Sequence, residues 1–234
     1  MTTVDVVIPV HNEEGVLSHS INTLRQFLEK NLPHRWTIII ADNASTDKTW
    51  RIAQALSQEH PDVAAIHLNE KGRGRALRNA WLKSAADVVS YMDVDLSTDL
   101  AAFPQLIQEI DNGYDVAIGS RLLPDSSVKR SFKRELTSRS YNLLIKVMFR
   151  TKFSDAQCGF KALSSRAAHE LVPLVRDQAW FFDTELLIVA QKKGYQIREI
   201  PVAWIEDPDT RVSIPKTVLD DLKGLLRMRF RPLP

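Results

Sequence analysis

The stretch Val4-Asp5-Val6-Val7-Ile8-Pro9-Val10 decides how the rest of the chain is interpreted. It is a short, largely β-branched run that ends in a turn, and Thr37-Ile38-Ile39-Ile40-Ala41 is a second run of the same kind. Continuous apolar runs of this length predict strands that are buried on both faces, as in a parallel sheet. Residues Glu13 to Lys30, between the two runs, carry apolar side chains at helical spacing. The start of the chain therefore predicts a strand–helix–strand unit.

The same alternation continues as far as Gly119. Helices are predicted for Asp47–Glu59, Gly74–Ala86 and Phe103–Asp111, and strands for Val63–Leu68, Val88–Met92 and Val116–Gly119. This order implies right-handed crossovers and an α/β fold, with a mainly parallel central sheet flanked by helices. Such sheets bind their ligands at the carboxyl ends of the strands.

Beyond Gly119 the alternation breaks down. Helices are predicted for Ser138–Phe149, Ala167–Val175 and Thr184–Lys192, a loop for Asp155–Lys161 and a strand for Ile197–Ile205. The tail from Lys216 to Phe230 places apolar residues on one face and gathers basic residues at its end. We find no internal repeat and no obvious linker, so we expect a single domain over residues 1–234.

The composition is that of an ordinary globular protein, with 234 residues, 44% hydrophobic and 26% charged. Its single cysteine, Cys158, excludes an internal disulfide framework and favours a reducing compartment. The N-terminus does not resemble a signal peptide, and no window approaches the roughly 20 apolar residues of a spanning helix. We therefore expect that the chain, as given, does not cross a membrane.

The basic residues are unevenly distributed along the chain. Eight basic residues and one acid lie between Val128 and Phe153, a net charge of +7, whereas the whole chain carries +2 and the remainder therefore −5. A basic segment on an otherwise acidic protein indicates a phosphate-bearing partner or a membrane surface. We expect no nucleic-acid partner.

An acidic pair, Asp93 and Asp95, follows the predicted strand Val88–Met92. Side chains two residues apart in an extended segment point the same way, so both carboxylates can bind one hard cation. Magnesium or manganese fits, because each accepts a few carboxylates together with water and phosphate oxygens. The alternative is helix capping, with Asp99 among the capping residues.

Polar loops also follow the first three predicted strands. They are Pro9–Glu14, Asp42–Asp47 and Asn69–Arg75. Carboxylates and amides can hydrogen-bond a nucleobase or ribose, and Lys71, Arg73 and Arg75 can face phosphates. Each loop alone also fits a helix cap or a turn. Their joint position at one edge of a parallel sheet favours a ligand site.

Three of these segments together resemble the family 2 glycosyltransferases of the GT-A fold: Val6–Glu14, Asp42–Asp47 and Asp93–Asp95. Within that family, four further segments resemble the polyprenyl-phosphate sugar synthases, which include dolichyl-phosphate glucosyl- and mannosyltransferases: Gly119–Arg121, Arg130–Arg134, Asp155–Lys161 and Phe182–Leu187. The resemblance runs from about Val4 to about Phe230. It implies inverting transfer of a hexose from a nucleotide diphosphate sugar, UDP-glucose or GDP-mannose, to a polyprenyl phosphate, giving a β-linked lipid-phosphate sugar.

The resemblance also implies roles for individual residues. The nucleoside would be surrounded by Pro9, His11, Glu13, Ala41 and Asn43, with Asp42 close by, and Lys71 and Arg73 would belong to the same nucleotide-sugar site. The metal and the diphosphate would be held by Asp93 and Asp95, with Val94 between them, and Arg121 and Arg211 would face phosphates. The lipid phosphate would be bound by Arg130, Lys133 and Arg134, with Gln157 and Lys161 in the acceptor loop.

Two positions depart from the family pattern. Asn43 stands where many relatives have a second acid, and His11 stands where an aromatic residue is common. Both leave the identity of the nucleotide open. The segments Arg130–Arg134, Gln157–Lys161 and Phe182–Leu187 favour the glucosyl branch, but glucose and mannose both remain candidates.

The proposed acceptor bears on the need for a general base. A phosphate monoester has a second pKa of about 6, so it is largely dianionic at neutral pH and can attack directly. A metal and an arginine would stabilise the leaving diphosphate. Asp155 is then either a base or a residue that orders Gln157 or Lys161.

The expected domain has a nucleotide-sugar half (1–120), an acceptor half (121–215) and a basic amphipathic tail (216–234).

Two segments, Ser140–Phe153 and Lys216–Arg231, combine apolar faces with basic residues, as interfacial helices do. Helices packed on the core with a solvated cationic face would give the same pattern. A long prenyl acceptor favours the membrane, so we expect the protein at the cytoplasmic face of a membrane, with the tail leading to a membrane region absent here.

Two other functions remain open. A family 2 enzyme acting on a hydroxyl acceptor, such as a glycan or glycolipid, would need a true general base. A non-catalytic nucleotide-binding module that docks on membranes is the third candidate. A dinucleotide-dependent oxidoreductase is disfavoured because the first strand lacks the G-x-G-x-x-G motif.

Overall fold

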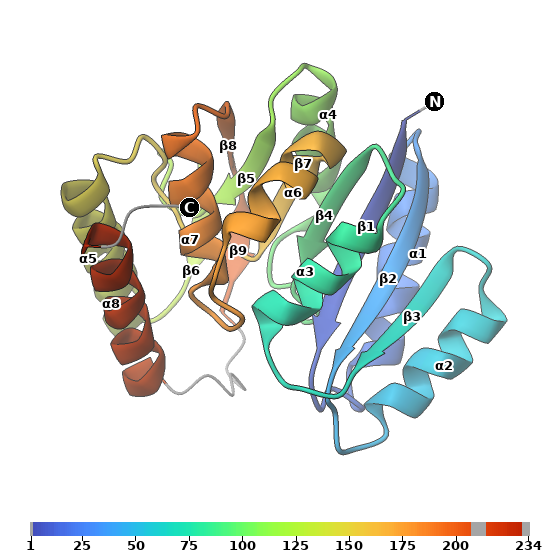
Figure 1. The fold of residues 1–234 in the computed structure, drawn as a ribbon. Coiled ribbons are helices and arrows are strands. Elements are labelled where there is room, and N and C mark those ends of the chain that lie inside the picture. The colour runs from blue at the N-terminus through green and yellow to red at the C-terminus, as the bar shows by residue number, and fades with distance from the viewer. Residues whose placement is uncertain (1, 207–213, 231–234) are drawn as a thin grey trace.

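Figure 1 shows the computed structural model, in which a twisted central sheet is covered by helices on both faces. It describes residues 2–206 and 214–230. The elements in chain order are β1 (Thr3–Val10), α1 (Leu17–Asn31), β2 (Arg35–Asn43), α2 (Thr49–Glu59), β3 (Val63–Leu68), α3 (Arg73–Lys83), β4 (Val88–Met92), η1 (Leu100–Ala102), α4 (Phe103–Asp111), β5 (Val116–Ser120), β6 (Ser127–Lys129), α5 (Phe132–Phe149), β7 (Phe160–Ser164), α6 (Ser165–Leu171), η2 (Val172–Leu174), α7 (Phe182–Lys192), β8 (Ile197–Pro201), β9 (Ala203–Ile205) and α8 (Ile214–Phe230).

The first four strands are parallel neighbours in the sheet. The full order is β3-β2-β1-β4-β7-β5-β8, and β1 pairs in parallel with both β2 and β4. Strand β1 lies inside the sheet, and Val6, Val7 and Ile8 are all buried because helices cover both of its faces. The predicted α/β fold with a mainly parallel sheet is confirmed. The carboxyl ends of β1 to β4 therefore meet at one edge.

Strand β7 is a difference from the sequence-based prediction, which made Asp155–Lys161 a loop. Phe160 and Lys161 belong to β7, which lies antiparallel between β4 and β5. The signal was missed because the strand is short and carries a lysine at a fully buried position. Strand β7 joins β5 and β8 to the first four strands, so the sheet is mixed.

The predicted strand Ile197–Ile205 is two strands rather than one. Strand β8 pairs in parallel with β5, the chain bends at Val202, and β9 pairs in parallel with β6 in a separate two-stranded sheet. Val202 makes the switch by donating to the Ser120 carbonyl and accepting from the Ser127 amide. This small sheet brings residues 127–129 next to residues 203–205.

The core has two parts, one on each face of the sheet. Helices α1, α2 and α4 cover one face, where Leu24 and Leu106 pack against β1 and β7. Helices α3, α6, α7 and α8 contribute to the other, where Trp81 and Leu186 lie beside Tyr91. Helix α7 is buried along most of its length, including its acids Asp183 and Glu185. Buried acids need partners, and these partners help to build the site described below.

Helices α5 and α8 lie side by side at one end of the molecule (Figure 1). Helix α5 begins at Phe132, earlier than the predicted Ser138, so it starts inside the basic segment. Both helices leave large apolar side chains exposed: Phe132, Leu136, Leu143 and Val147 on α5, and Val218, Leu219, Leu222, Leu226 and Phe230 on α8. No helix in the described part of the chain is both long and apolar enough to cross a membrane.

Candidate active site

The loops that follow β1 and β2 are joined by hydrogen bonds. The backbone amide of Asn12 donates to Ser45 Oγ at 2.9 Å, and the backbone amide of Thr46 donates to Asn12 Oδ1 at 2.8 Å. The backbone amide of Glu13 donates to Thr49 Oγ1 at 2.7 Å. Each loop therefore holds the other in place at the edge of the sheet. Pro9 and Ala41 lie at adjacent positions in the strands below, as their parallel register requires.

Three strand-end loops contain a non-glycine residue in the left-handed backbone region. They are Asn12 (φ 58°) after β1, Ala44 (φ 56°) after β2 and Leu96 (φ 51°) after β4. Such conformations cost on the order of 1 kcal/mol each and persist only where the surrounding contacts impose them. Local strain thus gathers at the sheet edge where the ligand site was predicted.

Asp42 and Asn43 have different roles at the end of β2. Asp42 is fully buried; His67 Nδ1 lies 2.6 Å from its Oδ2, while its Oδ1 has no hydrogen-bond partner among the described residues. Asn43 instead braces the loops, since its Oδ1 accepts from the Gly72 amide at 2.6 Å and its carbonyl bonds His11 Nδ1 at 2.9 Å. Of these two residues, Asp42 is therefore the one whose side chain can accept a hydrogen bond from a ligand. Sequence reasoning missed His67.

The acidic pair lies at the end of β4. The Asp93 side chain is 44% exposed and its Oδ1 accepts from Arg73 Nη2 at 2.5 Å, whereas Asp95 is exposed and accepts from the Ser97 amide. The capping function belongs to Asp99, which accepts from the Ala101 amide at the start of η1. Capping therefore does not account for Asp93.

The carboxylates of Asp93 and Asp95 fit a hard divalent cation. Both are accessible oxygen ligands, and Gly159 packs so closely that an added Cβ would lie 1.9 Å from Asp93 Oδ2. Within the described residues, no group of three or more His, Cys, Asp or Glu side chains gathers as a metal cage. Two carboxylates with water and phosphate oxygens are the usual arrangement for magnesium, so these residues suit an ion that arrives with a diphosphate.

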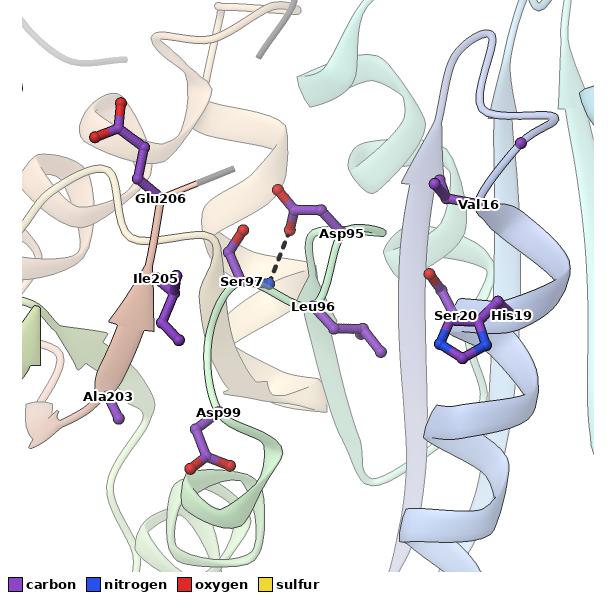
Figure 2. Close-up of a pocket in the computed structure, with 11 residues that line it drawn as sticks. Val16, His19, Ser20, Asp95, Leu96, Ser97, Asp99, Ala203, Ile205 and Glu206 are labelled. Carbon is purple, nitrogen blue, oxygen red and sulfur yellow. Dashed lines mark hydrogen bonds between the residues drawn. The ribbon is translucent and has the colours of Figure 1, made fainter. Parts of the chain in front are cut away.

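Figure 2 shows a pocket of about 730 Å³ that opens beside Asp95, between the start of α1 and strand β9. Val16 and His19 line one wall, and Ile205 and Glu206 line the other. Pockets of this size accommodate small-molecule ligands. Asp95 therefore borders a space that is large enough for part of a substrate.

A buried ionic cluster connects Asp93 to helix α7. Arg73, the first residue of α3, donates from Nη1 to Asp183 Oδ2 at 2.6 Å as well as from Nη2 to Asp93. Asp183 also accepts from the Tyr91 hydroxyl and lies 3.0 Å from Lys161 Nζ. Burial alone raises the pKa of Asp183, but the charges of Lys161 and Arg73 lower it below its ordinary value. Asp183 is therefore ionised.

The cluster changes the interpretation of Lys161. This side chain is fully buried, and its ammonium donates to the Cys158 carbonyl at 2.6 Å in addition to facing Asp183. It has no exposed surface through which to contact an acceptor, in contrast to the predicted acceptor role. Sequence reasoning assigned no role to Asp183 or Tyr91, although the segment Phe182–Leu187 was among those that resembled the family.

Asp155 and Arg121 form a second buried pair. Arg121 Nε and Nη2 donate to the two Asp155 oxygens at 2.8 and 3.0 Å, and the Arg121 amide adds a third bond. Burial raises the pKa of Asp155, but the charge and hydrogen bonds of Arg121 lower it to about 2. Both oxygens are occupied and the group is a very weak base. The geometry therefore favours an ordering role, in which Asp155 holds Arg121 and accepts a hydrogen bond from the backbone amide of Gln157.

The predicted acceptor residues lie near the start of α5 and differ in exposure. Arg130 bonds Glu135 through Nε, and its Nη2 is buried without a partner among the described residues. Arg134 Nη1 donates to Glu206 at 2.8 Å, and Lys133 is exposed. Arg130 is thus the member of the set with an unused buried donor.

Gln157, another predicted acceptor residue, contacts helix α8. Its side-chain amide donates to Asp221 Oδ2 on α8 at 2.7 Å. Asp221 is almost fully buried, and burial raises its pKa to about 6. Gln157 therefore connects the loop before β7 to helix α8. Arg211, predicted to face phosphates, lies outside the described residues.

Known proteins resemble this chain in sequence. "Glycosyltransferase AglD" of Haloferax volcanii is 36% identical over 227 residues; the match covers 96% of this chain and 36% of that protein. "Dolichyl-phosphate beta-glucosyltransferase" of Dictyostelium discoideum is 28% identical over 242 residues, covering 97% of this chain and 74% of that protein. The Saccharomyces cerevisiae protein of the same name is 28% identical over 245 residues, with coverages of 96% and 73%. This chain thus spans only about a third of the length of the first relative.

Solved structures resemble the chain in fold. Glucosyl-3-phosphoglycerate synthase from Mycobacterium tuberculosis, in complex with UDP, aligns with a TM-score of 0.72 at 18% identity, covering 96% of this chain and 79% of that chain. The same enzyme with Mn²⁺ and UDP-glucose aligns with a TM-score of 0.70 at 17% identity, covering 97% and 79%. These alignments establish a fold of the GT-A type. Residues 5–172, more than half of the sequence, match Glycosyl transferase family 2, and the chain therefore belongs to this family of enzymes.

Proposed function

We propose that this glycosyltransferase moves a hexose from a nucleotide diphosphate sugar to a polyprenyl phosphate, with inversion at the anomeric carbon. Glucose is the hexose that we propose first. The observation that carries the proposal is the Arg121–Asp155 pair, in which both oxygens of the acid are bound by the arginine. An acid held in this way is poorly suited to deprotonate a hydroxyl acceptor. A phosphate acceptor brings its own negative charge and needs no base.

The named relatives support the choice of substrates. Two of them are called dolichyl-phosphate beta-glucosyltransferases, and their matches cover nearly the whole of this chain. The structural relative was solved with Mn²⁺ and UDP-glucose. These names support a glucosyl donor, a divalent metal and a polyprenyl phosphate acceptor here.

The donor side works mainly by neutralising charge. Asp93 and Asp95 would hold magnesium or manganese, which when bound stabilises the negative charge that develops on the leaving diphosphate. Asp42, whose buried Oδ1 has no partner among the described residues, would accept an N–H group of the base. Arg121, fixed by Asp155, would donate to phosphate oxygens from a position that costs no reorganisation during the reaction.

The acceptor side would bind the lipid phosphate at the start of α5. The Nη2 of Arg130, which has no partner within the part of the chain that the structure describes, would supply one donor, and the exposed Lys133 would supply a second positive charge. A phosphate oxygen then attacks the anomeric carbon as the bond from that carbon to the diphosphate oxygen breaks. The acceptor's negative charge is used in the new bond and the diphosphate leaves with one more, so no proton transfer is required.

Helices α5 and α8 would dock on the cytoplasmic face of a membrane. Their exposed apolar side chains, which include Leu143 on α5 and Leu222 on α8, are accompanied by Lys133, Arg139, Lys223 and Arg229. Apolar side chains beside basic ones suit the boundary between acyl chains and anionic headgroups. This arrangement would bring the prenyl acceptor to the start of α5.

A donor and acceptor panel tests the proposal. UDP-glucose, GDP-mannose and the other UDP- and GDP-sugars are offered with a short polyprenyl phosphate or the matching polyprenol, in Mg²⁺ or Mn²⁺, and lipid-linked sugar is measured. We expect transfer from UDP-glucose to the phosphate only. Transfer to the polyprenol would favour the hydroxyl-acceptor enzyme, and nucleotide binding without any transfer would favour the non-catalytic module.

A further inference from the structure

Arg73 sits between the two carboxylates that it pairs with. Its side chain is 11% exposed, with Asp93 on the accessible side and Asp183, 2% exposed, on the buried side. The guanidinium lies 4.9 Å from the Tyr91 ring and 5.0 Å from the Trp180 ring, so two aromatic faces enclose it. The enclosure leaves the guanidinium little freedom other than the choice of which acid it bonds.

The backbone around Arg73 is also fixed. The first amides of α3 are used by the segment before α7, since Gly74 donates to the Ala179 carbonyl and Arg75 to the Gln178 carbonyl. A Cβ added at Gly74 would lie 2.6 Å from Phe182 Cβ, so the two segments are in tight contact. Arg73 can therefore change partner only by rotating its side-chain end.

The charges of the cluster balance as they stand. Arg73 and Lys161 contribute two positive charges, and Asp93 and Asp183 contribute two negative charges. Asp183 keeps Lys161 and the Tyr91 hydroxyl as partners whatever Arg73 does. A divalent cation at Asp93 would therefore compete with Arg73 for the Asp93 carboxylate and repel the charge of Arg73.

We propose that Arg73 occupies the metal-binding carboxylate of Asp93 when no metal is bound. Asp183 is then the positioning residue that holds Arg73 in place when a divalent cation binds Asp93. The inference rests on the proposed function, because it assigns Asp93 to the metal. Once displaced, Nη2 of Arg73 is beside the ion and turns toward the diphosphate oxygens that the ion brings. Arg73 thus weakens the binding of metal alone and strengthens the binding of metal with nucleotide.

This arrangement predicts opposite effects for the two partners. Removing Arg73 removes the competitor, so metal alone binds Asp93 more tightly. Removing the charge of Asp183 leaves Arg73 with Asp93 as its one acidic partner in the cluster, so metal alone binds more weakly. A merely structural ion pair would move both affinities in the same direction, because either change would loosen the same site.

The test measures Mn²⁺ binding by the disappearance of the free-ion electron paramagnetic resonance signal, without donor or acceptor. We expect about fivefold tighter binding of Mn²⁺ alone in Arg73→Met and about fivefold weaker binding in Asp183→Asn, the size of a partly exposed ion pair. With UDP present, Arg73→Met should bind Mn²⁺ and UDP together about tenfold more weakly than the wild type. If the donor panel selects a GDP-sugar, GDP replaces UDP.

The matched control is Glu185→Gln on the same helix. Glu185 is 3% exposed and pairs with Arg227 at 2.7 Å, a buried acid–arginine pair that does not include Asp93. The affinity of the Glu185→Gln variant for Mn²⁺ should stay within about twofold of the wild-type affinity. Arg73→Met is expected to fold because Asp183 still has Lys161 and Tyr91, so its result stands even if Asp183→Asn is unstable.

The outcomes separate this inference from the proposed function. Mn²⁺ binding that depends on Asp93 but is unchanged or weakened in Arg73→Met would overturn the role of Arg73 while leaving the metal site intact. Equal shifts in the same direction for Arg73→Met and Asp183→Asn would do the same. A wild-type protein that binds no Mn²⁺, even with UDP, would overturn both the inference and the metal centre.

Discussion

Two parts of this site, the strand-end loops and the buried ion pairs, are held in place by different means. In the strand-end loops, neighbouring parallel strands end together and their loops bond one another over short distances, as Asn12 does with Ser45. The buried ion pairs join distant segments, as Arg121 does with Asp155 and Arg73 does with Asp183. The strand-end loops therefore depend on strand order and loop strain, whereas the second part of the site depends on compensated charge.

This difference predicts where function and stability can be separated. A carboxylate that is exposed at a strand end can lose its charge without harm to the fold. A charge in one of the buried ion pairs cannot, because its partner would be left unpaired in the core. Four substitutions test this difference, and the largest expected effect comes first.

Asp93→Asn should abolish transfer while sparing the fold. The side chain is 44% exposed and its charge is the metal ligand of the proposed mechanism, so we expect kcat/KM to fall by at least about 10²-fold. Asp99→Asn is the control, because Asp99 caps η1 and lies outside the acidic pair. Transfer assays and thermal denaturation check both. Full activity in Asp93→Asn would show that the Asp93 carboxylate is not needed for transfer, which would contradict the proposed metal site.

Asp155→Asn should damage stability and activity together. It leaves the buried guanidinium of Arg121 facing a neutral amide with one acceptor oxygen in place of a carboxylate, so we expect the free energy of unfolding to fall by about 3 kcal/mol and kcat/KM to fall by about 10- to 100-fold. Urea denaturation and transfer assays measure the two losses. Asp115→Asn is the control, since the Arg166 partner of Asp115 is 65% exposed.

The pH dependence of this loss has a definite sign. The pKa of Asp155 is lowered to about 2 in the folded protein, below its ordinary value of 3.8. The stabilisation is therefore fully present above the ordinary value and is lost as the pH falls through about 2. The difference between wild type and Asp155→Asn should stay constant from about pH 5 to about pH 8. A difference that changed in this range would contradict the assignment.

Asp221→Asn should change how stability depends on pH. Burial raises the pKa of Asp221 to about 6, opposed by the hydrogen bond from Gln157 and increased by the charge of Asp177. The folded state then binds a proton more tightly than the unfolded state, so the wild type gains stability as the pH falls from above 6 toward 4, by about 2 kcal/mol. The variant should lack this gain in denaturation curves at about pH 8 and about pH 5.

The two proteins should therefore differ most above pH 6. If Asp221→Asn showed the same pH dependence as the wild type, the tie between α8 and the loop before β7 would not involve a buried ionisable group. Asp220→Asn is a convenient control, because Asp220 is the adjacent residue on α8 and is exposed.

Ala44→Gly should stabilise the donor side slightly. Ala44 has φ 56°, which glycine adopts without the steric cost that a Cβ imposes, so we expect a gain of about 1 kcal/mol. The same substitution at Ala55, exposed in the middle of α2, should cost about 1 kcal/mol. Chemical denaturation measures both. A loss at Ala44 would show that the loop does not impose the strained conformation.

Much of the donor side could be predicted from the sequence. The strands β1 to β4 and the polar loops after them follow from apolar runs and their spacing, and the structure places these loops together. The roles within the loops were less readable. Asn43 holds Gly72 while Asp42 keeps a spare oxygen, a division that depends on side-chain rotamers rather than residue types.

The buried ion pairs were harder to predict because their partners are far apart in the chain. Arg73 and Asp183 are separated by 110 positions, and no local pattern marks them as a pair. The family resemblance implied an acceptor role for Lys161, yet this lysine is completely buried in β7. Lysines are rarely buried in this way, so the sequence did not indicate the strand either.

Short-range hydrophobic periodicity predicts the alternation of strands and helices, the parallel start of the sheet and the position of Asp93 and Asp95 at a strand end. The antiparallel entry of β7 into the sheet, the pairing of Asp155 with Arg121 and the bridge from Asp93 through Arg73 to Asp183 are visible in the folded chain alone. A buried charge is stable only beside its partner, and folding is what brings such distant partners together.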